Sequence, residues 1–199
     1  MSTAGNSTHL EALAAKYGTD KLEHGYIPFY VEHLPKEPKR ILEIGVKEGR
    51  SMQMWSNYFP NAEIHGLDLF AEITIESIRC YLLGLDGDCN NNIALHQGNQ
   101  CDWRVLEELR KYDFDVIIED CSHNCRDQWI TLMGLIDSCK LYFIEDLHSN
   151  TDSFYRQGLD FDSTILGAMI NNKFPFDFKL YNNKIAVIYG RSGNMETNK

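Results

Sequence analysis

Two pairs of consecutive acids are the residues best suited to chemistry in this chain. The pairs are Glu119-Asp120 and Glu145-Asp146, and each directly follows a short, mainly apolar run typical of a strand covered on both faces. If these two strands are neighbours, their ends lie only ~5 Å apart, and three or four carboxylates converge at one edge of the sheet. Because buried carboxylates are costly unless they are paired or bind a cation, this cluster favours Mg²⁺, Mn²⁺ or Ca²⁺.

A titratable histidine lies in the loop that follows the first acid pair. His123 is three residues past Asp120, and histidine is the side chain best suited to accept a proton near neutral pH. Each residue alone also has a structural interpretation, because the acids can cap helices or pair with Arg126 and Lys140, and a loop histidine is often a surface residue. The two acid pairs at corresponding strand ends favour the metal site, and a neighbouring metal favours His123 as the general base.

A glycine turn in the first third of the chain indicates a second ligand site. Residues 40–51, RILEIGVKEGRS, predict a short buried strand, a turn containing Gly45 and Gly49, and the start of a helix. A dinucleotide fingerprint needs Gly-x-Gly-x-x-Gly, but Val46 occupies the place of the second glycine. Glu43 would repel a phosphate, whereas it suits a cationic or amine-bearing ligand. An ordinary turn between a strand and a helix explains this stretch alone equally well.

An aspartate ends the next predicted strand, residues 63–69. Asp68 lies roughly 20 residues after the glycine turn, where Rossmann-like sites place an acid on ribose hydroxyls. A solvated aspartate at a strand end is the alternative interpretation, and the spacing favours ligand binding.

The rest of the chain alternates strands with helices and closes with a hairpin. Strands are predicted over residues 92–96, 114–120 and 141–144, and Asn182-Asn183 is typical of the turn between two final strands. This order predicts an α/β fold, a Rossmann-like, doubly wound and mostly parallel sheet with an antiparallel last strand.

The N-terminal residues 1–36 are predicted to form a helical cover. Thr8 begins a capping-box pattern, Gly18 would end that helix, and Pro28 can start a second one. We predict a single domain over residues 1–190, followed by a flexible polar tail over 191–199.

Two later segments carry predictions of their own. Residues 86–90 lack parts of a calcium-binding loop and are predicted to be a surface loop. A helix over residues 127–138 is predicted to bury most of Trp129, Ile130, Met133, Leu135 and Ile136.

Composition narrows the classes of partner and compartment. The 199 residues carry a formal net charge of −10 without a basic stripe, which argues against a nucleic-acid partner. We see no signal peptide and no apolar run near the ~20 residues of a membrane span, so no membrane partner is expected. The six cysteines form no Cys-x-x-Cys pair, which favours reduced thiols in a cytoplasmic protein.

Several motifs together resemble a known family. The turn at residues 43–49 resembles motif I of class I S-adenosylmethionine (SAM) methyltransferases, and the closing hairpin is the methyltransferase variant of the doubly wound sheet. The whole set resembles the metal-dependent sugar O-methyltransferases, which methylate deoxysugars such as rhamnose on macrolide and polyketide glycosides. Its motifs, in chain order, are KYGTDK at 16–21, HGY at 24–26, EIG at 43–45, GNQ at 98–100, DCSH at 120–123 and IEDLH at 144–148.

The resemblance implies cofactors and roles. It implies a Mg²⁺ (or Mn²⁺) held by Asp120, Glu145 and Asp146, with His123 as the general base. It also implies a SAM cofactor, a sugar hydroxyl of a small molecule or glycan as the acceptor, and allows a homo-oligomer. In this interpretation SAM is held by Glu43, Gly45, Gly49, Ser51, Asp68 and Gln100, with Asp68 at the ribose and the turn at 98–100 at the adenine.

The chain departs from the family pattern in four places, so alternatives stay open. Glu119 replaces an aspartate, Cys121 a glycine and Asn99 an aspartate, and the loop at 137–140 lacks the usual Pro-Gly-Gly. None of these changes removes a predicted ligand, but they leave the acceptor and the oligomeric state open. The alternatives are a SAM enzyme acting on a catechol-like acceptor, a nicotinamide-dependent oxidoreductase and a non-catalytic SAM-binding module.

Overall fold

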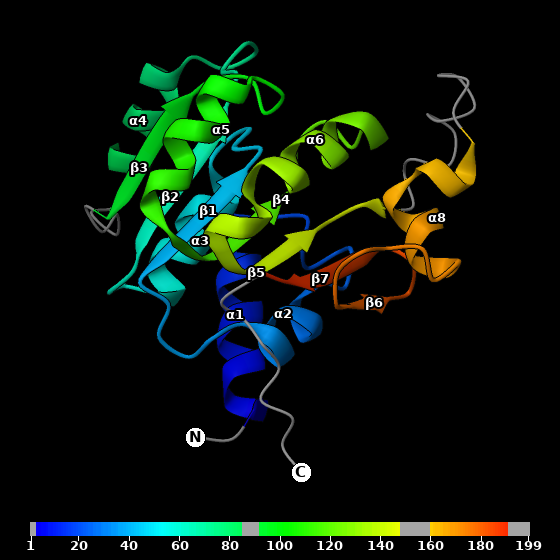
Figure 1. Cartoon of the computed structure of the whole chain (residues 1–199). Helices are drawn as coiled ribbons and strands as arrows, with labels where there is room; N and C mark the ends of the chain where they lie inside the picture. Colours follow the sequence, from blue (N-terminus) through cyan, green and yellow to red (C-terminus); the bar gives the residue numbers. More distant parts are fainter. Residues whose placement is uncertain (1–2, 85–91, 148–159, 191–199) are drawn as a thin grey trace. The chain divides into compact units, whose positions relative to one another are not determined.

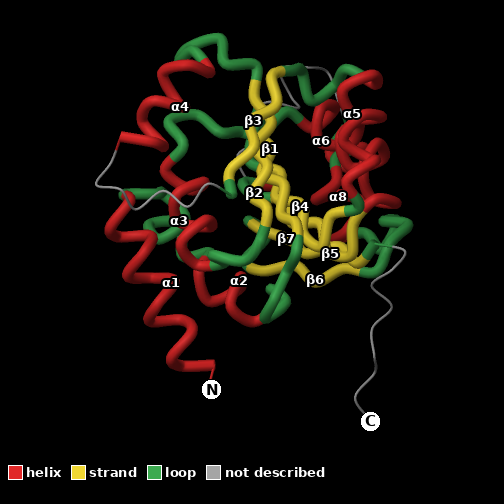
Figure 2. The backbone as a smooth tube through the Cα atoms, turned by 90° about the vertical axis from the view of Figure 1, so that its left-hand side faces the viewer, coloured by secondary structure: helices red, strands yellow, loops and turns green. Residues whose placement is uncertain are grey.

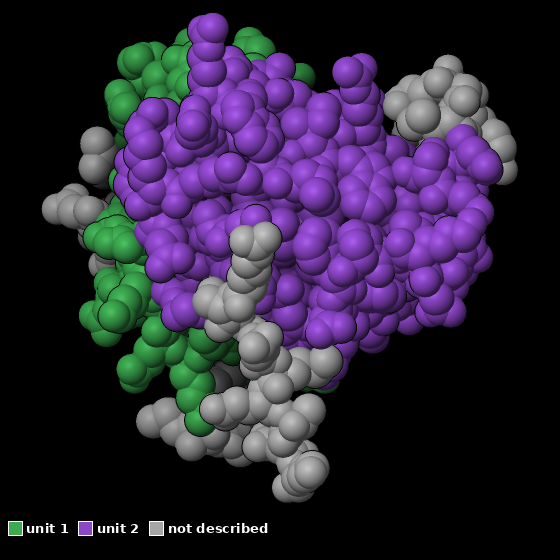
Figure 3. Space-filling model, in the orientation of Figure 1, with its two compact units in different colours: residues 1–98 green, residues 99–199 purple. Residues whose placement is uncertain are grey.

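The structure, a computed structural model, describes residues 3–84, 92–147 and 160–190 (Figure 1). The chain divides into two compact units, residues 1–98 and residues 99–199 (Figure 3). The predictions for residues 86–90, for His148 and for the tail at 191–199 concern parts of the chain outside the described residues.

The first unit contains three parallel strands and the N-terminal helices. Its strands pair in the order β3-β2-β1, and Ile41, Leu42 and Ile44 of β1 are fully buried, as expected for a strand covered on both faces. In Figure 2, α1, α3 and α4 lie on one side of these strands. The elements are α1 (Thr3–Tyr17), α2 (Ile27–His33), β1 (Arg40–Ile44), α3 (Arg50–Tyr58), β2 (Glu63–Asp68), α4 (Ile75–Gly84) and β3 (Ile93–Gln97).

The second unit contains two parallel strands followed by the closing hairpin. Its helical elements are α5 (Trp103–Leu109), η1 (Arg110–Tyr112), α6 (Cys125–Leu135), η2 (Ile136–Ser138), η4 (Phe161–Ser163) and α8 (Ile165–Ile170). Its strands are β4 (Phe114–Glu119), β5 (Cys139–Ile144), β6 (Phe178–Tyr181) and β7 (Ile185–Tyr189). Strand β5 pairs parallel with β4 and antiparallel with β7, which pairs antiparallel with β6. Figure 2 shows α5, α6 and α8 on one side of these strands.

The strand order confirms the predicted fold class. The seven strands follow the order β3-β2-β1-β4-β5-β7-β6, with the antiparallel strand β7 at the end of the chain. The hairpin turn lies at Asn182 and Asn183, whose φ angles of 51° and 56° are left-handed, a conformation that asparagine tolerates. Gly18, with φ of 68°, follows the last residue of α1 as predicted.

Two local predictions are wrong. Helix α1 begins at Thr3, so Thr8 lies inside the helix and does not cap it, and Glu11 accepts a hydrogen bond from Ser7 Oγ at 2.8 Å, one turn earlier. Met133 is 51% exposed, because α6 turns Gln128, Thr131 and Leu132 toward the interior instead. A count of apolar positions gave the wrong orientation for α6, because polar residues lie on its buried face.

Among the described residues, no helix is long and apolar enough to cross a membrane. No disulfide joins the described cysteines, which are Cys80, Cys101, Cys121, Cys125 and Cys139.

Candidate active site

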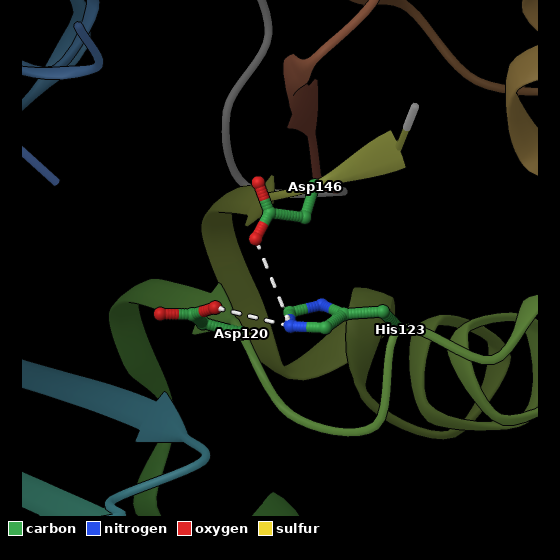
Figure 4. Close-up of side chains that lie close together, drawn as sticks. All are labelled: Asp120, His123 and Asp146. Carbon is green, nitrogen blue, oxygen red and sulfur yellow. Dashed lines mark ion pairs between the residues drawn. The ribbon is translucent and has the colours of Figure 1, made fainter. Parts of the chain in front are cut away.

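Three side chains of the second unit form the candidate cation site (Figure 4). His123 Nε2 lies 3.7 Å from Asp146 Oδ2 and 4.0 Å from Asp120 Oδ1. The ligand atoms of the three residues all lie within 4.8 Å of one another. Asp120 directly follows β4 and Asp146 lies two residues after β5, so the parallel pairing of these strands brings the two carboxylates together as predicted.

The backbone around this group is unusual. His123 has φ of 52° and Asp146 has φ of 54°, the left-handed region that residues other than glycine seldom adopt. Such conformations cost about 1–3 kcal/mol each and persist where the surrounding structure holds them, often at functional sites. The Nε2 edge of the His123 ring faces the carboxylates. Its Nδ1 is buried and has no hydrogen-bond partner among the described residues.

The group contains two of the four acids that the sequence places at these strand ends. Glu119 is fully buried and accepts a hydrogen bond from Gln100 Nε2 at 3.2 Å, so its carboxylate belongs to the interior. Burial raises the pKa of Glu119 to about 8, an effect that hydrogen bonds from neighbouring amides oppose. Glu145 is 1% exposed and is not a member of the group, so its role as a metal ligand stays a prediction.

The group has the donors and the spacing that a hard cation requires. Two ligand atoms on opposite sides of a Mg²⁺ ion lie about 4.2 Å apart, twice a bond length of about 2.1 Å. The ligand atoms of Asp120 and Asp146 lie within 4.8 Å of each other, a separation that one cation can bridge. Asp120 and Asp146 therefore fit a divalent cation that keeps further positions for water or an acceptor.

The glycine turn of the first unit is held by Asp68. Asp68 Oδ2 accepts hydrogen bonds from Val46 N at 2.8 Å and Lys47 N at 3.0 Å, and its Oδ1 accepts one from Phe70 N at 2.9 Å. Oδ1 can accept a second bond, so Asp68 keeps acceptor capacity for a ribose hydroxyl. The predicted ribose contact stays a prediction, and the structure adds a structural role for the same side chain.

The two glycines of this turn need their conformational freedom. Gly45 has φ of 102° and Gly49 has φ of 79°, and Gly49 caps α3. Ser51 is the second residue of α3 and is partly exposed. All three are therefore in the turn or the first helical turn after it, as the sequence predicts.

Glu43 has a partner that the sequence did not reveal. Lys21 Nζ lies 3.1 Å from Glu43 Oε1, and both side chains have no exposed surface. Lys21 comes from the segment between α1 and α2, whose role the sequence left open. The structure therefore pairs Glu43 with a protein cation, where the sequence predicts a cofactor amine.

Gln100 likewise has a protein environment. It is 6% exposed, and its Nε2 lies 3.2 Å from both Glu119 Oε1 and Thr131 Oγ1. Its predicted role at the adenine stays a prediction.

Comparison with solved structures identifies the fold. The fold matches the solved structure of MycE methyltransferase from the mycinamycin biosynthetic pathway, in complex with Mg and SAH, with a TM-score of 0.69 and 24% identity over 94% of this chain and 56% of that one. It also matches a putative caffeoyl-CoA O-methyltransferase from Staphylococcus aureus with a TM-score of 0.53 and 12% identity, over 90% of this chain and 82% of that one. The fold is therefore that of a class I methyltransferase.

Curated relatives narrow the resemblance to sugar O-methyltransferases. The chain is 31% identical over 155 residues to 8-demethyl-8-(2-methoxy-alpha-L-rhamnosyl)-tetracenomycin-C 3'-O-methyltransferase of Streptomyces olivaceus, covering 69% of this chain and 36% of that protein. It is 30% identical, with the same coverage, to mycinamicin VI 2''-O-methyltransferase of Micromonospora griseorubida. The chain thus spans about a third of the length of these relatives. No family model matches the chain. The resemblance predicted from the motifs is confirmed.

Proposed function

We propose that the chain is a SAM- and Mg²⁺-dependent O-methyltransferase that acts on a sugar hydroxyl of a glycoside or glycan. The observation that carries this proposal is the group of Asp120, His123 and Asp146 at the ends of two neighbouring strands in a class I methyltransferase fold. The curated relatives support the acceptor class, because one of them is named for O-methylation of a rhamnosyl tetracenomycin.

The chain's own residues divide the work. Asp120 and Asp146 would hold the cation, and the first-unit turn with Gly45, Gly49 and Asp68 would bind SAM. When bound, the cation would stabilise negative charge on an acceptor oxygen and SAM would supply the methyl group. His123 Nε2 would accept the hydroxyl proton, an aid worth roughly 10²–10⁴-fold.

The proposal is tested by methyl transfer from SAM to a panel of rhamnosides, other glycosides and catechols. We expect transfer to a glycoside, loss of turnover with EDTA and recovery with Mg²⁺. Transfer only to catechols would favour the second acceptor class. Stabilisation by a nicotinamide cofactor instead of SAM would point to an oxidoreductase, and SAM binding without turnover on any acceptor to a binding module.

His123 can be tested separately from the cation. We expect His123→Ala to lower the rate of transfer by roughly 10²–10⁴-fold, with SAM and Mn²⁺ affinities within about threefold of wild type. His9→Ala, which alters an exposed histidine of α1, is the matched control and should keep wild-type transfer. Full activity in His123→Ala would remove His123 as the base, and loss of Mn²⁺ binding would make it a ligand.

A further inference from the structure

Glu119 occupies a central position beside the cation group without belonging to it. It is the last residue of β4 and directly precedes Asp120, yet its side chain has no exposed surface. Its backbone carbonyl also accepts a hydrogen bond from Glu145 N at 3.0 Å, which joins the ends of β4 and β5. The residue is therefore fixed to the two strand ends that carry Asp120 and Asp146.

The Glu119 carboxylate interacts with three other segments of the second unit. Gln100 Nε2 donates to its Oε1 at 3.2 Å, and this same Nε2 lies 3.2 Å from Thr131 Oγ1 of α6. Interactions with the backbone N–H of Cys121 and the side chain of Gln128 lower the pKa of Glu119. Its Oε2 is buried and has no hydrogen-bond partner among the described residues. The turn after β3, the loop after β4 and helix α6 thus meet at one buried carboxylate.

These interactions reach the residues next to Asp120 and Asp146 in the chain. Cys121 lies in the loop between Asp120 and His123, so its interaction with Glu119 restrains that loop. Gln128 Nε2 also lies 3.5 Å from the carbonyl oxygen of Glu145, the residue before Asp146. His123 and Asp146 both have left-handed backbones, which need restraint from their surroundings.

We propose that Glu119 is a positioning residue, whose buried carboxylate holds the cation-binding loop and the end of β5 in register through its hydrogen bond from Gln100 and its interactions with Gln128 and Cys121. This inference rests on the proposed function, since it assigns Glu119 to the same cation site. Residues that hold metal ligands in place typically change metal affinity by 10–100-fold when they are lost.

Mn²⁺ binding, followed by calorimetry and by electron paramagnetic resonance, tests the inference without reliance on turnover. We expect Glu119→Ala to weaken Mn²⁺ binding by about 10–100-fold while SAM affinity stays within about threefold. Glu119→Gln keeps an oxygen acceptor for the same donors, so we expect its Mn²⁺ affinity to remain within about threefold of wild type. The rescue by glutamine separates hydrogen bonding from mere occupation of the site.

Two further variants keep the test decisive. Ile118→Ala removes the neighbouring fully buried side chain of the same strand, and should lower stability while Mn²⁺ affinity is retained. If Glu119→Ala does not fold, Gln128→Ala removes the Gln128 interactions with both Glu119 and Glu145 and should still weaken Mn²⁺ binding several-fold. Unchanged Mn²⁺ affinity in a folded Glu119→Ala or Gln128→Ala variant, or equal losses in Ile118→Ala, would overturn the inference while the proposed function stands. A wild-type protein that binds no Mn²⁺ would overturn both.

Discussion

Two buried glutamates at strand ends, one in each unit, are held in opposite ways. Glu43 of β1 lies beside the ammonium of Lys21 at 3.1 Å, whereas Glu119 of β4 has the neutral amide of Gln100 at 3.2 Å. Neither side chain has exposed surface. A buried carboxylate beside an ammonium is compensated in charge, but one surrounded by amides is not, and burial therefore raises the pKa of Glu119 to about 8.

The two glutamates lie in similar sequence contexts, but different interactions stabilise them. The Glu43 pair ties the segment between α1 and α2 to the strand that leads into the glycine turn. The Glu119 hydrogen bonds tie together segments of the second unit around the candidate cation site. The first arrangement depends on charge, and the second depends on donors and acceptors.

Substitution of Lys21 should show the largest difference in stability between the two glutamate environments. Lys21→Met would leave the Glu43 carboxylate buried without this cation, and removal of one partner of a buried ion pair costs about 3–5 kcal/mol. We expect thermal unfolding to shift downward by roughly 2–4 °C for each kcal/mol. Glu119→Gln, which exchanges an acid for an amide of the same shape, should cost less than about 1 kcal/mol.

The control for this prediction removes both charges. Lys21→Met combined with Glu43→Gln should recover most of the stability that Lys21→Met alone loses. A double variant as unstable as the single one would show that packing by Lys21, not its charge, matters.

His65 is a third buried titratable group, and burial favours the neutral form of its ring. Burial, together with the neighbouring His96, lowers the pKa of His65 to about 4, and burial also lowers the pKa of His96. The unfolded chain therefore binds more protons below pH 6.5, so this contribution to stability is present above pH 6.5 and is lost as the pH falls toward 4. We expect the melting temperature to fall over this range, and His65→Asn to flatten the fall. An equal fall in the variant would contradict the assignment.

A smaller effect tests the second link to the Lys21 segment. Arg50 Nη1 donates to Gly18 O at 3.2 Å, and a Cβ on Gly18 would lie 3.0 Å from that same nitrogen. Gly18→Ala should therefore cost about 1–2 kcal/mol for its left-handed backbone and somewhat more for displacement of Arg50. Gly25→Ala is the matched control, because Gly25 is also left-handed but nothing lies within 4 Å of its added Cβ. Equal losses in both variants would show that the Arg50 contact contributes nothing measurable.

Sequence reasoning gave most of the architecture because its signals were local. Apolar runs located β1, β4 and β5, and Asn182-Asn183 located the hairpin. The capping-box pattern at Thr8 misplaced the start of α1, because Glu11 is engaged by Ser7 within the helix. Patterns that recur inside helices cannot by themselves fix where a helix begins.

The sequence predicted the part of the candidate site that depends on the parallel pairing of neighbouring strands. Neighbouring strands bring Asp120 and Asp146 together with His123. The sequence could not predict where each acidic side chain points. Glu119 points inward to Gln100, and Glu43 points to Lys21. These buried polar pairings join residues 19 and 22 positions apart in the chain, and no local pattern records them.

The most direct measurement is a crystal structure of the protein grown with Mn²⁺ and SAH. The account predicts one anomalous peak about 2.1–2.3 Å from carboxylate oxygens of Asp120 and Asp146, with SAH at the turn formed by Gly45 and Gly49. Ordered SAH with no peak at these carboxylates, or with the two strand ends held together by a protein cation, would contradict it.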